Sequence, residues 1–181
     1  MRMNRDAALT AADIVNNYSE NELVNVFSQY GEVFNAKTLA KKIMEVRKNK
    51  KINDVMEFRT AINSCTNKQH ENQYFAKVFQ ALRIEVNDEI QSLREMLLQA
   101  SQVLALNGRL VVMSYHSLED RLVKNLIAKG KFEGEVEKDL FGHPQFTPLT
   151  AINKKPIEAS EEEVVHNPRA RSAKLRIAYK N

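Results

Sequence analysis

The chain has 181 residues, of which 43% are hydrophobic and 28% charged, and its formal net charge is +4. These values are typical of a globular domain with one core, and no apolar run reaches the roughly 18 residues of a membrane span. No apolar signal core follows the N-terminus, and Cys65 is the single cysteine. We therefore expect a cytoplasmic protein without a disulfide or a cysteine-based metal cage.

Positive charge gathers in two segments of the chain. Residues 37–51 hold seven Lys and Arg residues against one acid, Glu45, and residues 169–176 hold four and no acid. Such patches favour an anionic partner, although the first is equally well explained as the solvated face of a helix. The five glycines have no spacing typical of a dinucleotide- or phosphate-binding loop.

The first seventy residues predict four short helices that form a small bundle. Thr10 and Ser19 each begin a capping box, and Gly31 follows the second helix where a helix commonly ends. A third helix is expected over residues 36–48, and Asn53 can cap a fourth. The segment from residue 72 to 106 contains no Gly or Pro, and predicts one long helix or two with a break near Asn87.

The hydrophobic period then changes. Residues 110–113 are a continuous run of β-forming side chains, which predicts a central strand covered on both faces, and residues 117–129 predict a helix. A strand, a tight turn and a helix in this order are half of a doubly wound unit. Further along, residues 146–152 and 174–179 are candidate strands, and Ser160 can begin a short helix.

The turn after the apolar strand carries the best candidates for chemistry, because ligands bind beyond the carboxyl ends of strands in open α/β sheets. Ser117 is explained as a helix N-cap, whereas Ser114, Tyr115 and His116 have no structural explanation. We take Ser114 and His116 as the candidate catalytic residues. The other histidines share no metal-ligand spacing, so no bound metal is expected.

Three long motifs resemble one known family. They are FQALRIEVNDE at 79–89, SYHSLEDRLVK at 114–124 and NPRARSAKLR at 167–176, and they occur in that order. Together they are similar to the C-terminal part of the RsmH (MraW) family of bacterial 16S rRNA cytosine methyltransferases. The resemblance covers essentially the whole chain.

This resemblance implies an α/β fold: the C-terminal portion of a Rossmann-like class I methyltransferase sheet with an inserted small helical bundle. Residues 1–8 would be a remnant of the methyltransferase domain, 9–72 the inserted RNA-recognition domain, and 73–181 the C-terminal part of the methyltransferase domain. The implied reaction is S-adenosylmethionine-dependent methylation of the 4-amino group of a cytidine in the decoding region of 16S rRNA. The family's N-terminal half, which holds the cofactor loop, is not in this chain, so no cofactor-binding residue is expected here.

The implied partner is 16S rRNA of the small ribosomal subunit, with no membrane involved. The alternation over residues 173–177 also describes a half-exposed strand whose basic side chains face water. Six basic residues are expected to contact the RNA: Arg2, Lys41, Lys42, Lys48, Arg169 and Arg171.

Two alternatives stay open at this point. One is a non-catalytic RNA-binding module of the same fold, and the other is a truncated product without a function of its own. Because the sheet's neighbouring strands belong to the family's other half, an exposed sheet edge is also expected to allow self-association.

Overall fold

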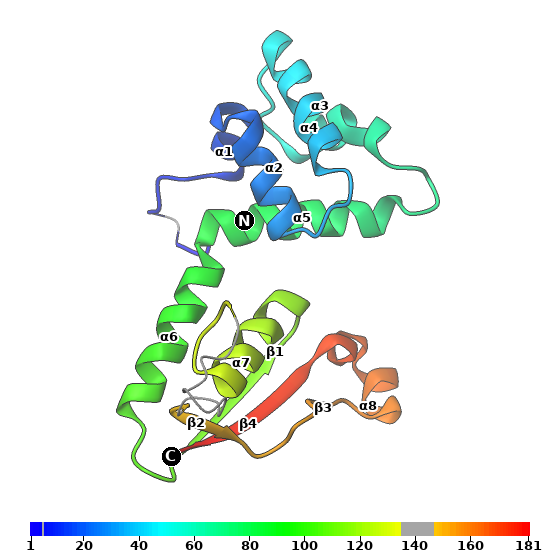
Figure 1. Cartoon of the computed structure of the whole chain (residues 1–181). Helices are drawn as coiled ribbons and strands as arrows, with labels where there is room; N and C mark the ends of the chain where they lie inside the picture. Colours follow the sequence, from blue (N-terminus) through cyan, green and yellow to red (C-terminus); the bar gives the residue numbers. More distant parts are fainter. Residues whose placement is uncertain (5, 135–146) are drawn as a thin grey trace. The chain divides into compact units, whose positions relative to one another are not determined.

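The computed structural model describes residues 1–4, 6–134 and 147–181. The described residues form two compact units, one spanning residues 1–89 and the other 90–181 (Figure 1). The first unit is helical, and the second combines helices with a small sheet, so the fold is of the mixed α/β class. None of the described helices is both long and apolar enough to cross a membrane.

The helical unit contains five α-helices and one 3₁₀ turn among its described residues. They are α1 (Ala11–Asn17), α2 (Glu20–Gln29), α3 (Ala36–Asn49), α4 (Val55–Ile62), the turn η1 (Asn63–Cys65) and α5 (Glu71–Asn87). The predicted capping boxes at Thr10 and Ser19 are both confirmed. The predicted cap of the fourth helix was wrong by one residue, because Asp54, not Asn53, accepts from the Glu57 amide.

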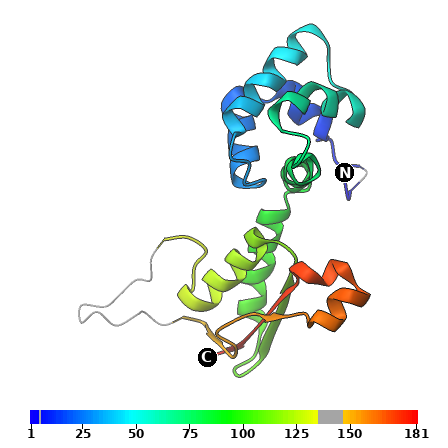
Figure 2. The ribbon, with the colours of Figure 1, turned by 90° about the vertical axis from the view of Figure 1, so that its right-hand side faces the viewer.

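The core of this unit is built mainly by α2, α3 and α5. Phe27, Leu39, Ile43 and Val78 are completely buried in it. Figure 2 shows α5 end-on beside the other helices of the unit. Since α5 supplies buried side chains to this core, the compact unit extends to residue 89, beyond the limit of 72 expected for the inserted domain.

A backbone break separates α5 from the next helix. Asp88 adopts a left-handed conformation with φ 48°, and α6 (Glu89–Val103) begins at the following residue. Of the two alternatives for the segment 72–106, the structure therefore confirms two helices with a break beside Asn87.

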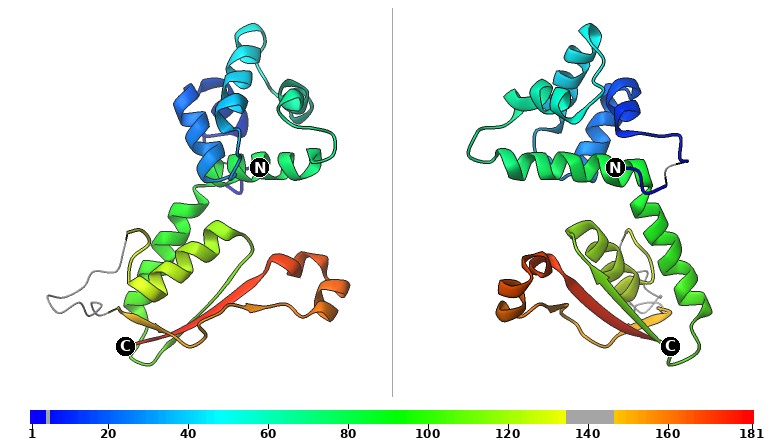
Figure 3. Two further views of the ribbon diagram at one scale, coloured as in Figure 1. Left: turned by 45° about the vertical axis from the view of Figure 1, so that its right-hand side comes forward. Right: turned by 180° about the vertical axis from the view of Figure 1, so that it is seen from behind.

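The described residues of the second unit form a four-stranded antiparallel sheet. Its strands are β1 (Arg109–Ser114), β2 (Leu149–Ala151), β3 (Ile157–Glu158) and β4 (Lys174–Lys180), and its helical segments are α6, α7 (Ser117–Lys129), α8 (Glu161–His166) and the 3₁₀ turn η2 (Pro168–Ser172). The central strand is β4, which pairs with β1 along one edge and with β2 and β3 along the other. The helices α6 and α7 pack against the sheet (Figure 3) and bury Leu97, Leu126 and Leu149.

The predicted strand over residues 110–113 is confirmed as β1, and among the described residues only one of its faces is covered. Among the described strands β1 pairs only with β4, and the pairing is antiparallel. Leu110 is buried against the helices, whereas Val111 and Met113 are 55% and 53% exposed. A continuous apolar run predicts a strand, but it does not reveal whether a second layer covers its other face.

The other strand and helix predictions are confirmed, and one of the strands is shorter than expected. The strand over 174–179 is confirmed as β4, and Ser160 caps α8 through its side chain. The candidate strand at 146–152 is reduced to β2, and its first residue, Phe146, lies outside the described residues.

Candidate functional site

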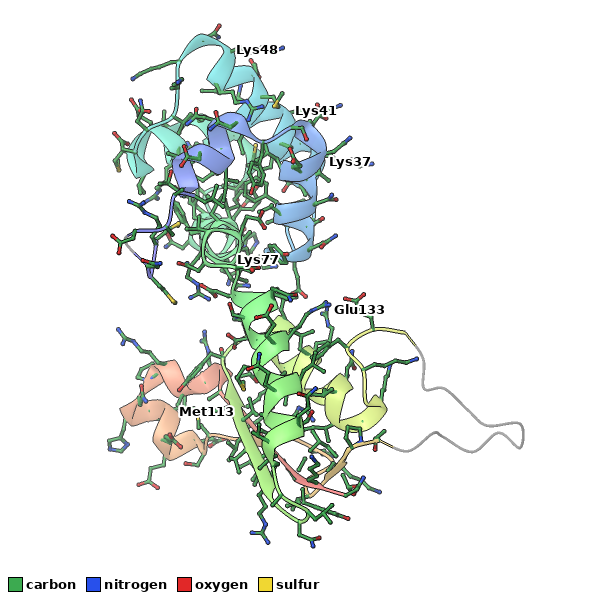
Figure 4. The ribbon with its side chains drawn as sticks, turned by 90° about the vertical axis from the view of Figure 1, so that its left-hand side faces the viewer. Lys37, Lys41, Lys48, Lys77, Met113 and Glu133 are labelled. Carbon is green, nitrogen blue, oxygen red and sulfur yellow. The ribbon has the colours of Figure 1, made fainter. Side chains whose placement is uncertain are left out.

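A concavity of about 560 Å³ lies at the end of β1 in the second unit. Antiparallel pairing places Ser114 of β1 opposite Lys174 of β4, so the turn after β1 lies beside the segment that precedes β4. Two of the three motifs that are distant in sequence therefore meet here. Its lining includes Met113 (labelled in Figure 4), Tyr115, Glu163, Asn167 and Arg169.

His116 has a structural role that its local sequence does not indicate. It is the N-cap of α7, and its Nδ1 accepts a hydrogen bond from the Glu119 amide at 3.4 Å. Its Nε2 lies 3.0 Å from Glu119 Oε1, although the alignment does not make a hydrogen bond. The assignment of the cap to Ser117 was wrong, because Ser117 is already the first residue of the helix.

The residues before the cap differ in accessibility. Ser114 is 3% exposed, and its Oγ donates to the Lys174 carbonyl oxygen at 3.4 Å. Tyr115 is 56% exposed, and its backbone amide donates to Glu119 Oε2 at 2.8 Å. Of the three candidate residues in this turn, only Tyr115 lines the concavity.

The carboxylate of Glu119 holds the turn in place. Burial alone would raise its pKa, but the nearby His116 and the hydrogen bond from the Tyr115 amide outweigh burial, so the pKa lies below the ordinary value of 4.5. The group is therefore charged at neutral pH and is a permanent acceptor for the Tyr115 amide.

A buried ion pair joins the first turn of α7 to β4. Arg176 Nε lies 2.6 Å from Asp120 Oδ1, and Arg176 Nη2 lies 3.0 Å from Asp120 Oδ2. Each residue is 8% exposed. The interpretation of Arg176 as a water-facing residue was therefore wrong. Nothing local in the sequence signals this pair, because it depends on the pairing of β1 with β4.

The expected RNA-contacting residues fall into two sets. Arg169 and Arg171 are exposed on η2 of the second unit. In the helical unit, Lys41 and Lys48 are exposed on α3, and Figure 4 shows them in line with Lys37 along one side of that helix.

Two further members of the helical set have contacts within the unit. Lys42 is partly buried, and its Nζ lies 3.0 Å from Glu45 Oε2. Arg2 is exposed, and its Nη1 donates to the Ala7 carbonyl oxygen at 2.6 Å. Lys42 is therefore less available for an anionic partner than Lys41 or Lys48. No group of three potential metal ligands occurs among the residues that the structure describes.

Comparison with known proteins identifies the family. The sequence profile of the MraW methylase family matches residues 1–181. Proteins named ribosomal RNA small subunit methyltransferase H match over 180 residues (99% of this chain) in Phocaeicola vulgatus, at 51% identity, and in Parabacteroides distasonis, at 52%. The protein of that name from Cytophaga hutchinsonii is 50% identical over 178 residues. The chain spans 59% of the length of each of these relatives. The three motifs agree with the profile match over the whole of this chain, and the chain belongs to the MraW methylase family.

Proposed function

We propose that this chain provides the RNA-binding and base-orienting part of an S-adenosylmethionine-dependent rRNA methyltransferase. The proposed substrate is the exocyclic 4-amino group of a cytidine in the decoding region of 16S rRNA. Family membership and the name that the relatives carry support the reaction class. The observation that carries the proposal for this chain is the concavity that brings Tyr115 and Arg169 together.

The chemistry explains why a positioning surface is needed. An exocyclic cytosine amine is a weak nucleophile because its lone pair is delocalised into the ring, so methyl transfer depends on alignment and on an acceptor for the amine proton. The base must also leave its stack to be reached. A fixed turn beside a cationic side chain can hold such an unstacked nucleotide.

The residues have separate parts in this proposal. Ser114 and His116 shape the turn through their contacts with β4 and α7. Tyr115 contacts the cytosine, and Arg169 and Arg171 contact phosphate groups through their guanidinium forks. Residues 9–72, as the RNA-recognition domain, contact a further part of the RNA through the α3 lysines.

The described residues do not fit a site for S-adenosylmethionine, the source of the methyl group. A side chain at Gly31 or Gly108 would lie within 2.9 Å of backbone oxygens, and Gly130 and Gly134 have positive φ, so each described glycine is needed for its own turn. None of them lies in the turn between β1 and α7. We propose that the cofactor binds to a Rossmann-like portion corresponding to the part of the relatives that this chain does not match.

An N-terminally extended protein tests the proposal. The chain is joined to the unmatched region of the Phocaeicola vulgatus relative, and methylation of 16S rRNA is followed by mass spectrometry of the digested RNA. We expect 4-amino-methylated cytidine from the extended protein, and strongly reduced product after Tyr115→Ala but not after the matched surface change Val165→Ala. Calorimetric titration should show S-adenosylmethionine binding by the extended protein only.

The outcomes separate the alternatives. RNA binding without methyl transfer by the extended protein would favour the non-catalytic module, and loss of both would favour a product without function. Micromolar binding of the cofactor by the unextended chain would contradict our assignment of the cofactor site.

A further inference from the structure

The turn between α2 and α3 holds an aromatic side chain in solvent. Phe34 is 91% exposed, whereas its neighbour Val33 is 4% exposed and Ala36 is 5% exposed. The Val33 amide donates to the Phe27 carbonyl oxygen at 3.0 Å, and Asn35 Nδ2 donates to the Cys65 carbonyl oxygen at 2.9 Å. A backbone hydrogen bond before Phe34 and a side-chain hydrogen bond after it thus anchor the turn that exposes the ring.

The same turn is pressed against α5. A Cβ atom at Gly31 would lie 2.9 Å from the Lys77 carbonyl oxygen, so only glycine permits this approach. The Gln80 side chain also donates to the Tyr30 carbonyl oxygen at 3.0 Å. Phe34 is therefore displayed by a braced turn rather than by a loose loop.

A concavity of about 480 Å³ lies beside the exposed ring. Its walls are Phe34, the segment 64–67, and residues of α5 and the loop before it. The Tyr74 hydroxyl and Asn35 Oδ1 are buried within its wall, and these two side chains lie close enough to interact with each other. The exposed polar side chains Asn67, His70 and Gln73 line it as well. The concavity thus offers both donors and acceptors, as the edge of a nucleobase requires.

Two lysines supply positive charge at this place. Lys77 lines the concavity, and Lys37 follows Phe34 by three residues at the start of α3. Both are exposed, and neither forms an ion pair with a described residue. Figure 4 labels both, and Lys37 continues the line of Lys48 and Lys41 along α3. A nucleic acid strand following that line reaches Phe34 at its end.

We propose that this concavity is a nucleotide subsite for single-stranded RNA. Phe34 stacks on one base, Lys37 and Lys77 contact the flanking phosphates, and the polar lining contacts the edge of the base. A lone exposed phenylalanine is common on protein surfaces; here the braced turn, the exposed polar lining and the two lysines lie beside one ring. The occupant is single-stranded because the bases of a duplex present no free face to stack on. The subsite deepens the proposed function, since it defines how the helical unit would hold the substrate.

The absence of tryptophan from the chain gives a direct test. Phe34→Trp introduces the only indole, and its fluorescence is followed while an oligocytidylate of eight nucleotides is added. We expect saturable quenching, because a stacked base lies against the ring. Met56→Trp, at a position 69% exposed on α4 of the same unit, is the matched control and should not be quenched.

Affinity measurements with the same oligonucleotide complete the test. Phe34→Ala should weaken binding by roughly 5- to 100-fold, as expected for the loss of one stacked base. Lys37→Glu and Lys77→Glu should weaken it more than Lys124→Glu, which makes the same charge change on α7. Circular dichroism should be unchanged for Phe34→Ala, because the side chain is almost fully exposed.

Several results would overturn the subsite. They are equal affinity of the Phe34→Ala and parent chains, equal quenching at both indole positions, or no binding of the oligonucleotide by the folded parent chain. Quenching by the whole ribosomal subunit but not by its naked RNA would assign Phe34 to a protein partner instead. Methyl transfer by the extended protein is a separate measurement, so the proposed function can stand if the subsite fails.

Discussion

The imidazole of His116 is both a helix cap and a neighbour of the proposed base-binding turn. Asn is among the best N-cap residues, whereas Ala offers no acceptor for the Glu119 amide. We expect His116→Ala to lower the free energy of unfolding by about 1 kcal/mol and His116→Asn to leave it nearly unchanged. Urea unfolding followed by circular dichroism measures both values.

In the extended protein, the same two variants distinguish a capping role of His116 from a role in orienting the substrate. If the imidazole only caps α7, His116→Asn retains methyl transfer. If the imidazole also orients the substrate, His116→Asn keeps the stability of the parent protein but transfers the methyl group more slowly. If His116→Ala and His116→Asn lower the free energy of unfolding equally, the hydrogen bond to the Glu119 amide is not what stabilises α7.

The ion pair between Asp120 and Arg176 predicts a dependence of stability on pH. The hydrogen bonds from Arg176, against a smaller opposing effect of burial, hold the pKa of Asp120 below its ordinary value of 3.8. A depressed folded-state pKa means that the contribution to stability is complete above pH 3.8 and is lost as the pH falls below it. We therefore expect the unfolding free energy of the second unit to drop in this acid range.

Substitution at Arg176 tests that assignment at neutral pH. Arg176→Met leaves the buried carboxylate without its partner and should cost about 3–5 kcal/mol at pH 7. The double change Asp120→Leu with Arg176→Met should recover much of this loss and remove the acid dependence, because no buried charge remains. If Arg176→Met alone is as stable as the parent chain at pH 7, the burial of the ion pair is contradicted.

At the scale of single elements, α3 is the test of RNA binding by the helical unit. Lys41 and Lys48 are exposed along one side, whereas Lys42 is partly buried and paired with Glu45. We expect Lys41→Gln and Lys48→Gln each to weaken binding to a 16S rRNA fragment regardless of sequence. Each should also reduce the slope of log K against log salt by about 0.7, because one phosphate is no longer neutralised. Lys42→Gln should have a smaller effect.

Filter binding over a range of salt concentrations measures these slopes for the parent chain and the three variants. Identical slopes for the parent chain and the variants would show that the α3 lysines form a solvated helix face and do not contact the RNA.

The elements also show which features a sequence can predict. The caps at Thr10, Ser19 and Ser160 depend on residues three positions apart, so local patterns were sufficient. Three features were not predicted. They are the antiparallel pairing of β1 with β4, the burial of Arg176 and the capping role of His116. The first two depend on a partner strand more than fifty residues away, and the third on a choice between adjacent residues that local propensity does not resolve. The sequence places the candidate site at the turn after β1, and Tyr115 is the candidate residue of that turn that lines the concavity.

At the scale of the whole molecule, the two units have separate cores, and β4 holds the second one together. Every described strand pairs with β4. A chain ending after Ala173 loses all of these pairings, so we expect fast amide hydrogen exchange in β1, α7 and β2 and unchanged protection in α2, α3 and α5. Exchange followed by mass spectrometry reports both regions, and loss of protection in the helical unit would contradict independent cores.

The exposed edge of the sheet leads to a prediction about association. Among the described strands β1 pairs on one side only, and Val111 and Met113 are exposed on it. An unpaired strand edge with apolar side chains pairs readily with another chain, and burying each large apolar side chain contributes about 1.5–3 kcal/mol. We therefore expect the chain to self-associate in a concentration-dependent manner and to bind a hydrophobic dye.

Lysine substitutions on β1 test this edge directly, since edge strands in natural proteins are protected by charged side chains. Val111→Lys combined with Met113→Lys should give a monomer in sedimentation velocity experiments with little dye binding. Val165→Lys adds charge at a position 77% exposed on α8 and should leave the association unchanged. A parent chain that sediments as a single monomeric species, unfolds cooperatively and binds no dye would show that the second unit is stable without a partner along β1.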